Sequence, residues 1–320
     1  MLETSFTRLI GCRRPIQLAP IGGADLVAAV CDAGGLGMVD QHYPSPPALD
    51  AGLDALAART RGVFGVNFLM PFLDERCLEV AARKARVVEF FYASPDAALV
   101  EKAGAAGALV AWQVGSLAEA QAAEAAGCDF VVVQGCESGG HVRGTVALLP
   151  LLSQAVERLH VPVVAAGGIA TARDLAAVLA CGASAARLGT RFLASHEADA
   201  HPSYVAALLA AGAEDTTLTT AFGADWPDAP HRVLRSAVEA AERCTDERVG
   251  EIRMHGEPLP VARFASAYPT RDATGRVDAM CLYAGESVAN IEAVMSAGEI
   301  VRELCDGAEA LLRSGAALVR

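Results

Sequence analysis

The sequence predicts an α/β fold, a closed (β/α)8 (TIM) barrel with a smaller inserted helical and irregular domain after the eighth strand. Eight short apolar segments, rich in β-branched and aromatic residues, follow one another along the chain, which is typical of strands buried on both faces. An alanine-rich amphipathic stretch follows each of them, and such alternation favours a parallel sheet. Eight regularly spaced units favour a closed barrel over an open sheet.

The first four strands are predicted from apolar segments that stop at turn-forming or polar residues. A proline and a glycine pair end the first segment, and both residue types interrupt regular structure. We therefore expect Pro20, Asp40, Asn67 and Tyr92 at strand ends. The strands cover residues 16–20, 36–39, 63–67 and 87–92, and the helices after them cover residues 24–32, 47–59, 73–85 and 95–105.

The second four strands end in polar or glycine-rich stretches. Their ends lie at Gln113, between Gln134 and His141, at Gly167-Gly168 and at Gly189-Thr190. In a (β/α)8 barrel the chemistry lies at the C-terminal ends of the strands, so we expect the functional groups on that rim. The strands cover residues 108–112, 130–133, 161–166 and 185–188, and a helix covers residues 117–126.

The regular spacing breaks down after about residue 211. Residues 214–276 are richer in Thr, Pro, Asp and Arg, with one helical run at residues 233–243. We predict three parts: a cofactor-binding barrel at residues 1–211, an inserted substrate or lid domain at residues 212–278, and a C-terminal helical segment completing the barrel at residues 279–320.

Composition and charge narrow the class of protein. The chain has 320 residues, 53% of them hydrophobic, which is enough for a large core. A net charge of −12 and a pI of about 5.1 argue against nucleic-acid binding, which needs a basic surface. Nine cysteines occur singly, and no Cys-x-x-Cys or His-Glu-x-x-His pattern predicts a metal site. We find no signal peptide and no membrane-spanning apolar run, and expect a cytoplasmic protein without membrane contact.

The loop after the sixth strand is the strongest candidate for catalysis. It carries Ser138, Gly139-Gly140, His141 and Arg143 directly behind a buried strand. The pKa of a histidine is ordinarily about 6.5, so His141 is a candidate general base near neutral pH. The alternative, a loop histidine satisfied by a backbone carbonyl, is less favoured at a barrel rim. A Ser–His nucleophile is disfavoured because Ser138 lacks the Gly-x-Ser-x-Gly turn.

Two glycine turns indicate a phosphorylated ligand. Gly167-Gly168 follows the seventh strand and Gly189-Thr190 follows the eighth, where barrels build phosphate sites. Backbone N–H groups at such turns bind phosphate dianions. Each pair alone is better explained as a tight turn, but both together favour the ligand.

Three amides are predicted at strand ends: Asn67, Gln113 and Gln134. An amide donates and accepts hydrogen bonds at once. A flat heterocycle with alternating N–H and C=O groups needs such partners, while strand-end capping is the alternative for each amide singly.

On these motifs the chain resembles the nitronate monooxygenases, formerly called 2-nitropropane dioxygenases. Flavin-dependent enoyl-ACP reductases and some NAD(P)H:quinone reductases share the same loops. Four positions depart from the family's usual residues: Ile21 replaces Met, Ser138 replaces Ala, and Arg187 and Glu286 each replace Gln. The resemblance runs over nearly the whole chain and rests on residues 65–68, 134–141, 165–170, 187–192 and 282–286.

The resemblance implies a barrel that binds FMN without a covalent bond. It implies His141 as the catalytic base. We also assign Tyr283 and, from its place in the loop after the sixth strand, Arg143 to the substrate; a solvated loop cation is at least as favoured for Arg143. No metal is expected. The cofactor site implied is Ala19, Pro20, Ile21, Asn67, Gln113, Gln134, Gly139, Gly140, Gly167, Gly168, Arg187, Leu188, Gly189 and Thr190.

The implied reaction is the oxidation of nitronates or nitroalkanes through FMN, with O2 as the electron acceptor. A homodimer is left open as the assembly. Three alternatives stay open: an NAD(P)H-dependent reductase of enoyl thioesters or quinones, a flavin- or phospholigand-binding protein without turnover, and a phosphate-handling isomerase or aldolase without flavin. No lysine stands at a predicted strand end, which disfavours a Schiff-base aldolase.

Overall fold

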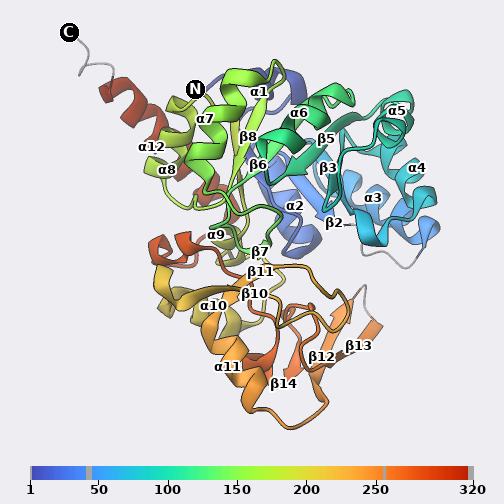
Figure 1. The fold of residues 1–320 in the computed structure, drawn as a ribbon, viewed down its shortest axis with the longest axis vertical. Helices are drawn as coiled ribbons and strands as arrows, with labels where there is room; N and C mark the ends of the chain where they lie inside the picture. The colour runs from blue at the N-terminus through green and yellow to red at the C-terminus, as the bar shows by residue number, and fades with distance from the viewer. Residues whose placement is uncertain (1, 41–44, 255–256, 316–320) are drawn as a thin grey trace.

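The computed structural model describes residues 2–40, 45–254 and 257–315. Eight parallel strands form its main sheet, as the sequence predicts, in the order β1-β9-β8-β6-β5-β4-β3-β2 (Figure 1). All of them lie within one or two residues of their predicted positions, because buried apolar segments of this length form strands with little ambiguity. They are β1 (Ile16–Leu18), β2 (Gly37–Asp40), β3 (Phe64–Leu69), β4 (Val87–Phe91), β5 (Leu109–Val114), β6 (Phe130–Gln134), β8 (Val163–Ala166) and β9 (Ala185–Leu188).

The first and second strands close the sheet into a barrel. Gln17 and Leu36 form a parallel bridge. The Leu18 N–H donates to the Leu36 carbonyl at 2.9 Å, and the Leu36 N–H donates to the Ile16 carbonyl at 2.8 Å. The predicted (β/α)8 barrel is therefore confirmed.

Helices follow the strands, and five of these helices begin at a side-chain cap. Ser45, Asp74, Asp96, Ser116 and Thr171 each accept a hydrogen bond from a backbone N–H of the first helical turn. None of the described helices is both long and apolar enough to cross a membrane. The helices around the barrel are α1 (Ser5–Ile10), α2 (Gly23–Asp32), α3 (Pro46–Arg59), α4 (Glu75–Lys84), α5 (Ala97–Ala105), α6 (Leu117–Ala125), α7 (Leu148–Arg158), α8 (Ala172–Ala180), α9 (Thr190–Leu193) and α12 (Ala297–Gly315), with the 3-10 turn η1 (Met70–Phe72).

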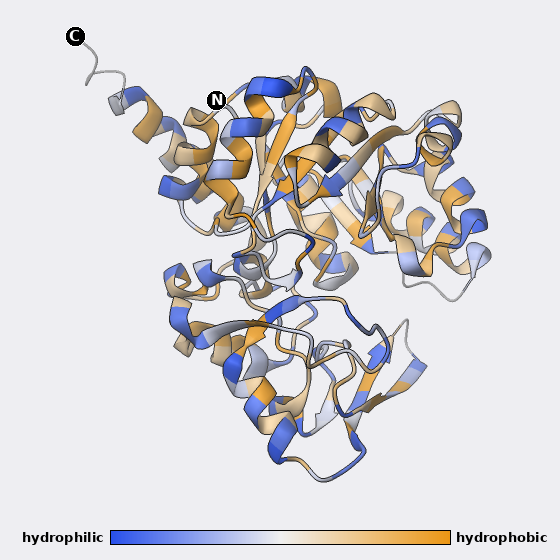
Figure 2. Ribbon diagram, in the orientation of Figure 1, coloured by the Kyte–Doolittle hydropathy of each residue, from blue (hydrophilic) through white to orange (hydrophobic). Residues whose placement is uncertain are grey.

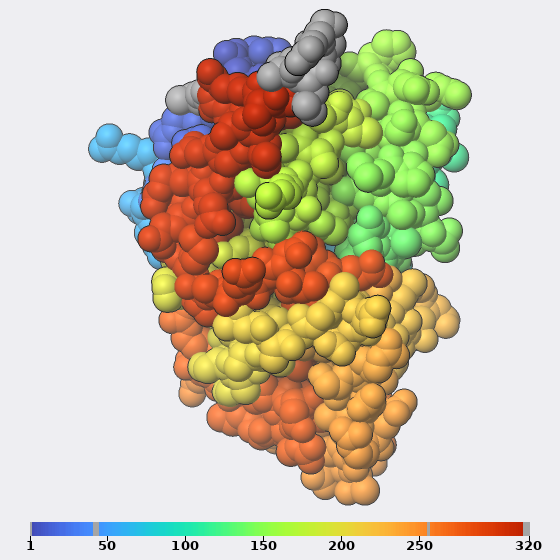
Figure 3. Space-filling view, turned by 90° about the vertical axis from the view of Figure 1, so that its left-hand side faces the viewer, coloured from blue at the N-terminus to red at the C-terminus, as the bar shows by residue number. Residues whose placement is uncertain are grey.

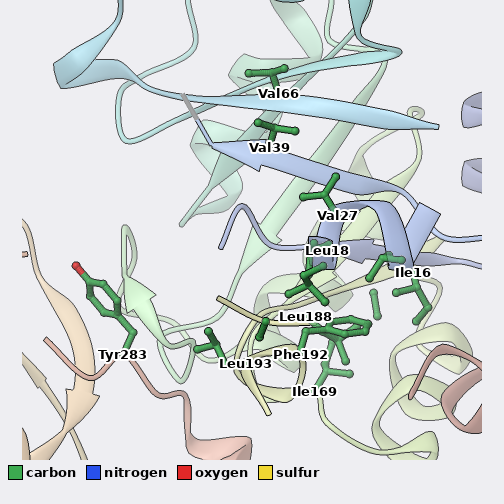
Figure 4. Packing of buried hydrophobic residues seen from close by; sticks show 14 of the residues in the cluster. Ile16, Leu18, Val27, Val39, Val66, Ile169, Leu188, Phe192, Leu193 and Tyr283 are labelled. Carbon is green, nitrogen blue, oxygen red and sulfur yellow. The ribbon is translucent and has the colours of Figure 1, made fainter. Parts of the chain in front are cut away.

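Buried apolar side chains pack between the strands and the helices. In Figure 2 the ribbon of the barrel strands is largely orange, the colour of hydrophobic residues. Figure 4 shows Leu18, Leu188 and Phe192 packed together in this core. At the N-terminal end of the barrel, Phe6 of α1 contacts Phe130 edge to face, with ring centroids 5.5 Å apart. Helix α1 therefore closes the N-terminal end of the barrel, and the C-terminal end remains open for a ligand site.

The segment after α9 contributes to two small sheets in addition to the predicted helix, and the first of them also takes in β7 from the loop after β6. Their orders are β10-β11-β7 and β13-β12-β14. We expected helix and irregular chain here, because the strands are short and β13 carries two prolines, which occur at sheet edges. The elements are β7 (Gly140–His141), α10 (Pro202–Ala210), η2 (Ala213–Asp215), β10 (Thr216–Thr219), β11 (His231–Leu234), α11 (Arg235–Arg243), β12 (Arg248–Met254), β13 (Glu257–Ala262), β14 (Thr274–Gly275), η3 (Val277–Ala279) and η4 (Glu286–Asn290).

Residues 212–278, which we call the insertion, lie below the barrel in Figure 1. The loop after β6 joins the two, since His141 of β7 pairs antiparallel with His231 of β11. Figure 3 shows the C-terminal segment (red) crossing the barrel and reaching the insertion (yellow and orange), and α12 packs on α8 and α2. The division of the chain into parts at residues 1–211, 212–278 and 279–320 remains a prediction.

Candidate functional site

A cavity of about 770 Å³ lies at the C-terminal ends of the strands, between the barrel and the insertion. Its volume is typical of cofactor and small-molecule sites. All the predicted site residues except Arg143 line it: Ala19, Pro20, Ile21, Asn67, Gln113, Gln134, Gly139, Gly140, His141, Gly167, Gly168, Arg187, Leu188, Gly189, Thr190 and Tyr283. The structure therefore brings together residues that the sequence places at separate strand ends.

A buried polar cluster lies inside the barrel beneath the cavity. Glu89 of β4 is fully buried and accepts hydrogen bonds from Gln17 Nε2 at 2.8 Å and from Asn67 Nδ2 at 2.7 Å. Arg187 of β9 forms a buried ion pair with the same carboxylate. The guanidinium thus has a counter-ion within the barrel, which the sequence analysis did not identify.

The three strand-end amides have different environments. Asn67 donates to Glu89. Gln134 holds the loop after β6, because its Nε2 donates to the His141 carbonyl at 2.8 Å and its Oε1 accepts from the Arg143 N–H at 3.1 Å. Gln113 Oε1 is buried and has no hydrogen-bond partner among the described residues. Gln113 therefore offers the cavity an acceptor that is ready for a ligand.

The two glycine turns differ in how closely they are packed. Gly167 has φ 111°, and a Cβ there would lie 2.4 Å from Ser138 Oγ, so this turn requires glycine. Gly189 has φ −119°, and a Cβ there would meet only Ala19 Cβ, at 3.3 Å. The Gly189 position is thus open towards the cavity, while the Gly167 turn is fixed against the loop after β6.

His141 lies among aromatic rings at the border of the barrel and the insertion. Its imidazole stacks on Trp226, with centroids 4.0 Å apart, and its centroid lies 5.8 Å from that of Tyr283. Its Nε2 atom is buried without a hydrogen-bond partner in the described structure. Burial is the main cause that lowers the pKa of His141 to about 3, and the neighbouring His231 lowers this pKa further.

This pKa corrects the expectation from the sequence, which assigned His141 an ordinary value near 6.5. The difference arises because four rings surround the imidazole, those of Tyr92, Trp226, His231 and Tyr283. The nearby carboxylate, Asp225, raises the pKa of His141 only as the smallest of the three contributions. His141 is therefore a neutral imidazole at physiological pH in this conformation.

Arg143 lies outside the cavity lining. Its guanidinium forms an ion pair with Glu119 at 2.8 Å and lies 5.6 Å from the centre of the Tyr92 ring. The predicted attraction of substrate by Arg143 is thus not matched by its position. Glu286, the other charged departure from the family pattern, forms an ion pair with Arg232 at 3.1 Å.

The insertion supplies a wall that the sequence analysis missed. Trp226 and Thr270 line the cavity, and Thr270 Oγ1 is a buried atom without a partner in the part of the chain that the structure describes. Apolar side chains of Phe72, Ile252 and Leu259 also face the cavity. The sequence does contain one indication of this wall. Trp226 is one of only two tryptophans in the chain and lies in a stretch rich in Asp, Pro and Gly.

The fold and the cavity define a class: a (β/α)8-barrel enzyme with a cofactor-sized site at the C-terminal ends of its strands. The chain belongs to the nitronate monooxygenase family, a family of flavin-dependent oxidoreductases, because the family model described as nitronate monooxygenase matches residues 73–307. The resemblance stated from the motifs is therefore confirmed.

Three similar proteins illustrate the range of the family and fold. A relative from Rhodococcus jostii, named (3aS,4S,5R,7aS)-5-hydroxy-7a-methyl-1-oxo-octahydro-1H-indene-4-carboxyl-CoA dehydrogenase, is 35% identical over 73% of this chain and 66% of its own length. The structure of FabK from Thermotoga maritima gives a TM-score of 0.82 at 26% identity and covers 100% of both chains. The structure of nitroalkane oxidase from Streptomyces ansochromogenes gives 0.78 at 30% identity, over 96% of this chain and 100% of its own.

Proposed function

We propose that the protein binds FMN in the cavity and oxidises nitronates or nitroalkanes, with O2 as the electron acceptor and His141 as the general base. One observation carries the proposal: a single cavity joins the glycine turns after β8 and β9 to His141. The family supports flavin chemistry, and the similar Streptomyces protein is named a nitroalkane oxidase.

The residues of the cavity fit a flavin nucleotide. The open backbone at Gly189 and the turn at Gly167-Gly168 are suited to a phosphate. Gln113 Oε1 is a buried acceptor without a partner among the described residues, which a heterocyclic N–H would satisfy. Ala19 and Pro20 supply apolar surface for a flat ring. FMN, when bound, would supply the acceptor for the substrate's electrons.

The role proposed for His141 is to take the acidic α-proton of a neutral nitroalkane. A neutral imidazole in the tautomer that leaves Nε2 unprotonated is able to do so; Nε2 has no hydrogen-bond partner among the described residues, and the lowered pKa keeps the ring neutral. Nε2 is covered in this structure, so a substrate reaches it only after a neighbouring ring, such as that of Trp226, moves aside. A preformed nitronate needs no base.

The test combines cofactor and substrate measurements. We expect the purified protein to be yellow and to release FMN on denaturation. We expect His141→Ala to retain FMN and to lose about 10²–10⁴-fold in rate with a neutral nitroalkane, the usual contribution of a general base. The loss with the preformed nitronate should be much smaller.

A matched control is His160→Ala, because the His160 side chain is 94% exposed and lies outside the cavity lining. Equal losses with both substrates in His141→Ala would show that His141 only positions the substrate. A colourless protein that takes up no FMN on reconstitution would refute the cofactor assignment.

A second candidate is a flavin-dependent dehydrogenase or reductase of coenzyme A thioesters. The name of the Rhodococcus relative favours it, as does the apolar wall of Phe72, Ile252 and Leu259, which suits a bulky acyl group. Anaerobic bleaching of the flavin separates the candidates: rapid bleaching by NAD(P)H or an acyl thioester, with no turnover of nitronate, would favour the second.

A further inference from the structure

The buried ion pair crosses the interior of the barrel. Glu89 belongs to β4 and Arg187 to β9, which stand on opposite sides of the ring of eight strands. Gln17 of β1 and Asn67 of β3 bind the same carboxylate from the strands beside these two. Three donors from three strands therefore fix the position of Glu89.

The pair has a definite direction relative to the cavity. Arg187 lines the cavity, whereas Glu89 is fully buried and is not part of the lining. In the described structure, Glu89 is the one acceptor bonded to the Arg187 guanidinium, and the remaining N–H groups of this five-donor fork are free for a ligand. The positive end of the pair therefore faces the cavity and the negative end lies behind it.

Stability does not explain this arrangement. Removing two charges from water is costly, and apolar residues of similar volume in such a place are often as stabilising or more so. Side chains inside (β/α)8 barrels are usually branched and apolar. An ion pair with its cation at the cavity is instead suited to act on whatever occupies the cavity, because charges interact strongly where water is excluded.

We propose that Glu89 and Arg187 act as an oriented dipole that raises the reduction potential of the cavity's flavin. This inference rests on the proposed binding of FMN. Two-electron reduction by the substrate, with uptake of one proton, leaves the ring with one more negative charge. A fixed guanidinium at the cavity floor stabilises that charge, and Glu89 holds the guanidinium in place. Glu89 is a positioning residue in this scheme.

The decisive variant is the double exchange Glu89→Gln with Arg187→Gln. It leaves the net charge of the protein unchanged, so only the local arrangement of charge differs from the parent. We expect the midpoint potential of bound FMN to fall, because the end of the dipole nearer the cavity is the positive one. Binding of reduced FMN should weaken relative to oxidised FMN by about tenfold, the effect of roughly one poorly screened charge.

The matched control exchanges an exposed pair, Glu239→Gln with Arg243→Gln, which changes the same charges on α11. It should leave the potential at the parent value. Arg187→Lys, which keeps a cation at the cavity, should restore most of the potential that Arg187→Gln loses. If the double variant does not fold, the single variant Glu89→Gln is used, because it leaves no buried carboxylate without a counter-ion. It keeps the Arg187 cation and removes the anion, so the midpoint potential should stay at or above the parent value, and a fall would contradict the inference.

A variant that lacks the Arg187 cation, binds FMN and has the parent's potential would overturn the inference and leave the pair a structural role. A rise in the midpoint potential of bound FMN in a variant that lacks the Arg187 cation would overturn the inference as well. Failure of the proposed function is distinguishable, because the parent protein itself would then take up no FMN.

Discussion

The imidazole of His141 stacks on the indole of Trp226, with ring centroids 4.0 Å apart and planes inclined by 28°. His141 comes from the loop after a barrel strand and Trp226 from the insertion, so the contact joins the two parts at the cavity. Trp226 is only 7% exposed, and its indole covers one face of the imidazole. The insertion thus contributes to the burial that lowers the pKa of the proposed base.

The first prediction concerns this contact. Trp226→Ala should raise the pKa of His141 from about 3 towards its ordinary value, because burial is the largest cause of the lowering. An NMR titration of the His141 ring would measure the shift. Phe72→Ala is the control. It removes a ring that contacts Trp226 edge to face, with centroids 5.2 Å apart, and leaves in place the Trp226 ring that stacks on His141. An unchanged pKa in Trp226→Ala would mean that His231 and the remaining walls of the site set it.

The second prediction concerns stability in mild acid. The folded pKa values of His141 and His231 are lowered, mainly by burial, so the unfolded chain binds more protons below about pH 6.5. Their contribution to stability is complete above that pH and is lost as the pH falls towards the folded pKa. For each histidine the equilibrium constant for unfolding should rise by up to about tenfold for each unit by which the pH falls within this window.

Urea unfolding at pH 7.5 and pH 5.5 would measure the effect. This range lies above the region where carboxylates with lowered pKa, such as Asp278 beside Arg276, begin to matter. His141→Gln should lose part of the pH dependence, whereas His160→Gln should keep most of it, since the His160 side chain is 94% exposed and lies 3.5 Å from the Glu124 carboxylate at the surface. The same pH dependence in parent and His141→Gln would contradict the burial argument.

The strand and helix positions could be predicted because they depend on local sequence. Apolar segments such as residues 130–134, followed by glycine, form buried strands almost regardless of the rest of the chain. The strand ends then place Gly167, Gly189 and His141 on one rim through the barrel topology alone. The family's motifs add which ligand to expect there.

What could not be predicted depends on contacts between distant residues. Glu89 and Arg187 are separated by 98 positions, and nothing in the sequence around either one indicates the other. The pKa of His141 was misjudged because it depends on Trp226, which lies in a segment without clear periodicity. Arg143 was placed at the substrate from its loop position, but Glu119 holds it elsewhere.

The third prediction separates cofactor binding from folding at a glycine turn. Gly189→Val should impair FMN retention more than folding, because φ at this position suits any residue and a Cβ meets only Ala19. The added side chain would then occupy space that the ligand needs. Gly104→Val, at an exposed glycine of α5, is the matched control and should retain FMN. Dialysis followed by flavin fluorescence measures retention, and equal FMN affinity in Gly189→Val and the parent would contradict the assignment.

The last prediction follows from the lowered pKa of His141. If the free enzyme holds this histidine neutral down to about pH 3, kcat/KM for a neutral nitroalkane should show no acid limb near pH 6.5. The kcat/KM profile reports groups of the free enzyme, whereas kcat reports the enzyme–substrate complex. A substrate that displaces Trp226 would change the surroundings of the imidazole. An acid limb seen in kcat but not in kcat/KM would then show that Trp226 moves only after the substrate has bound. An acid limb near pH 6.5 in kcat/KM, absent in His141→Ala, would instead show that His141 is exposed to water before substrate binds.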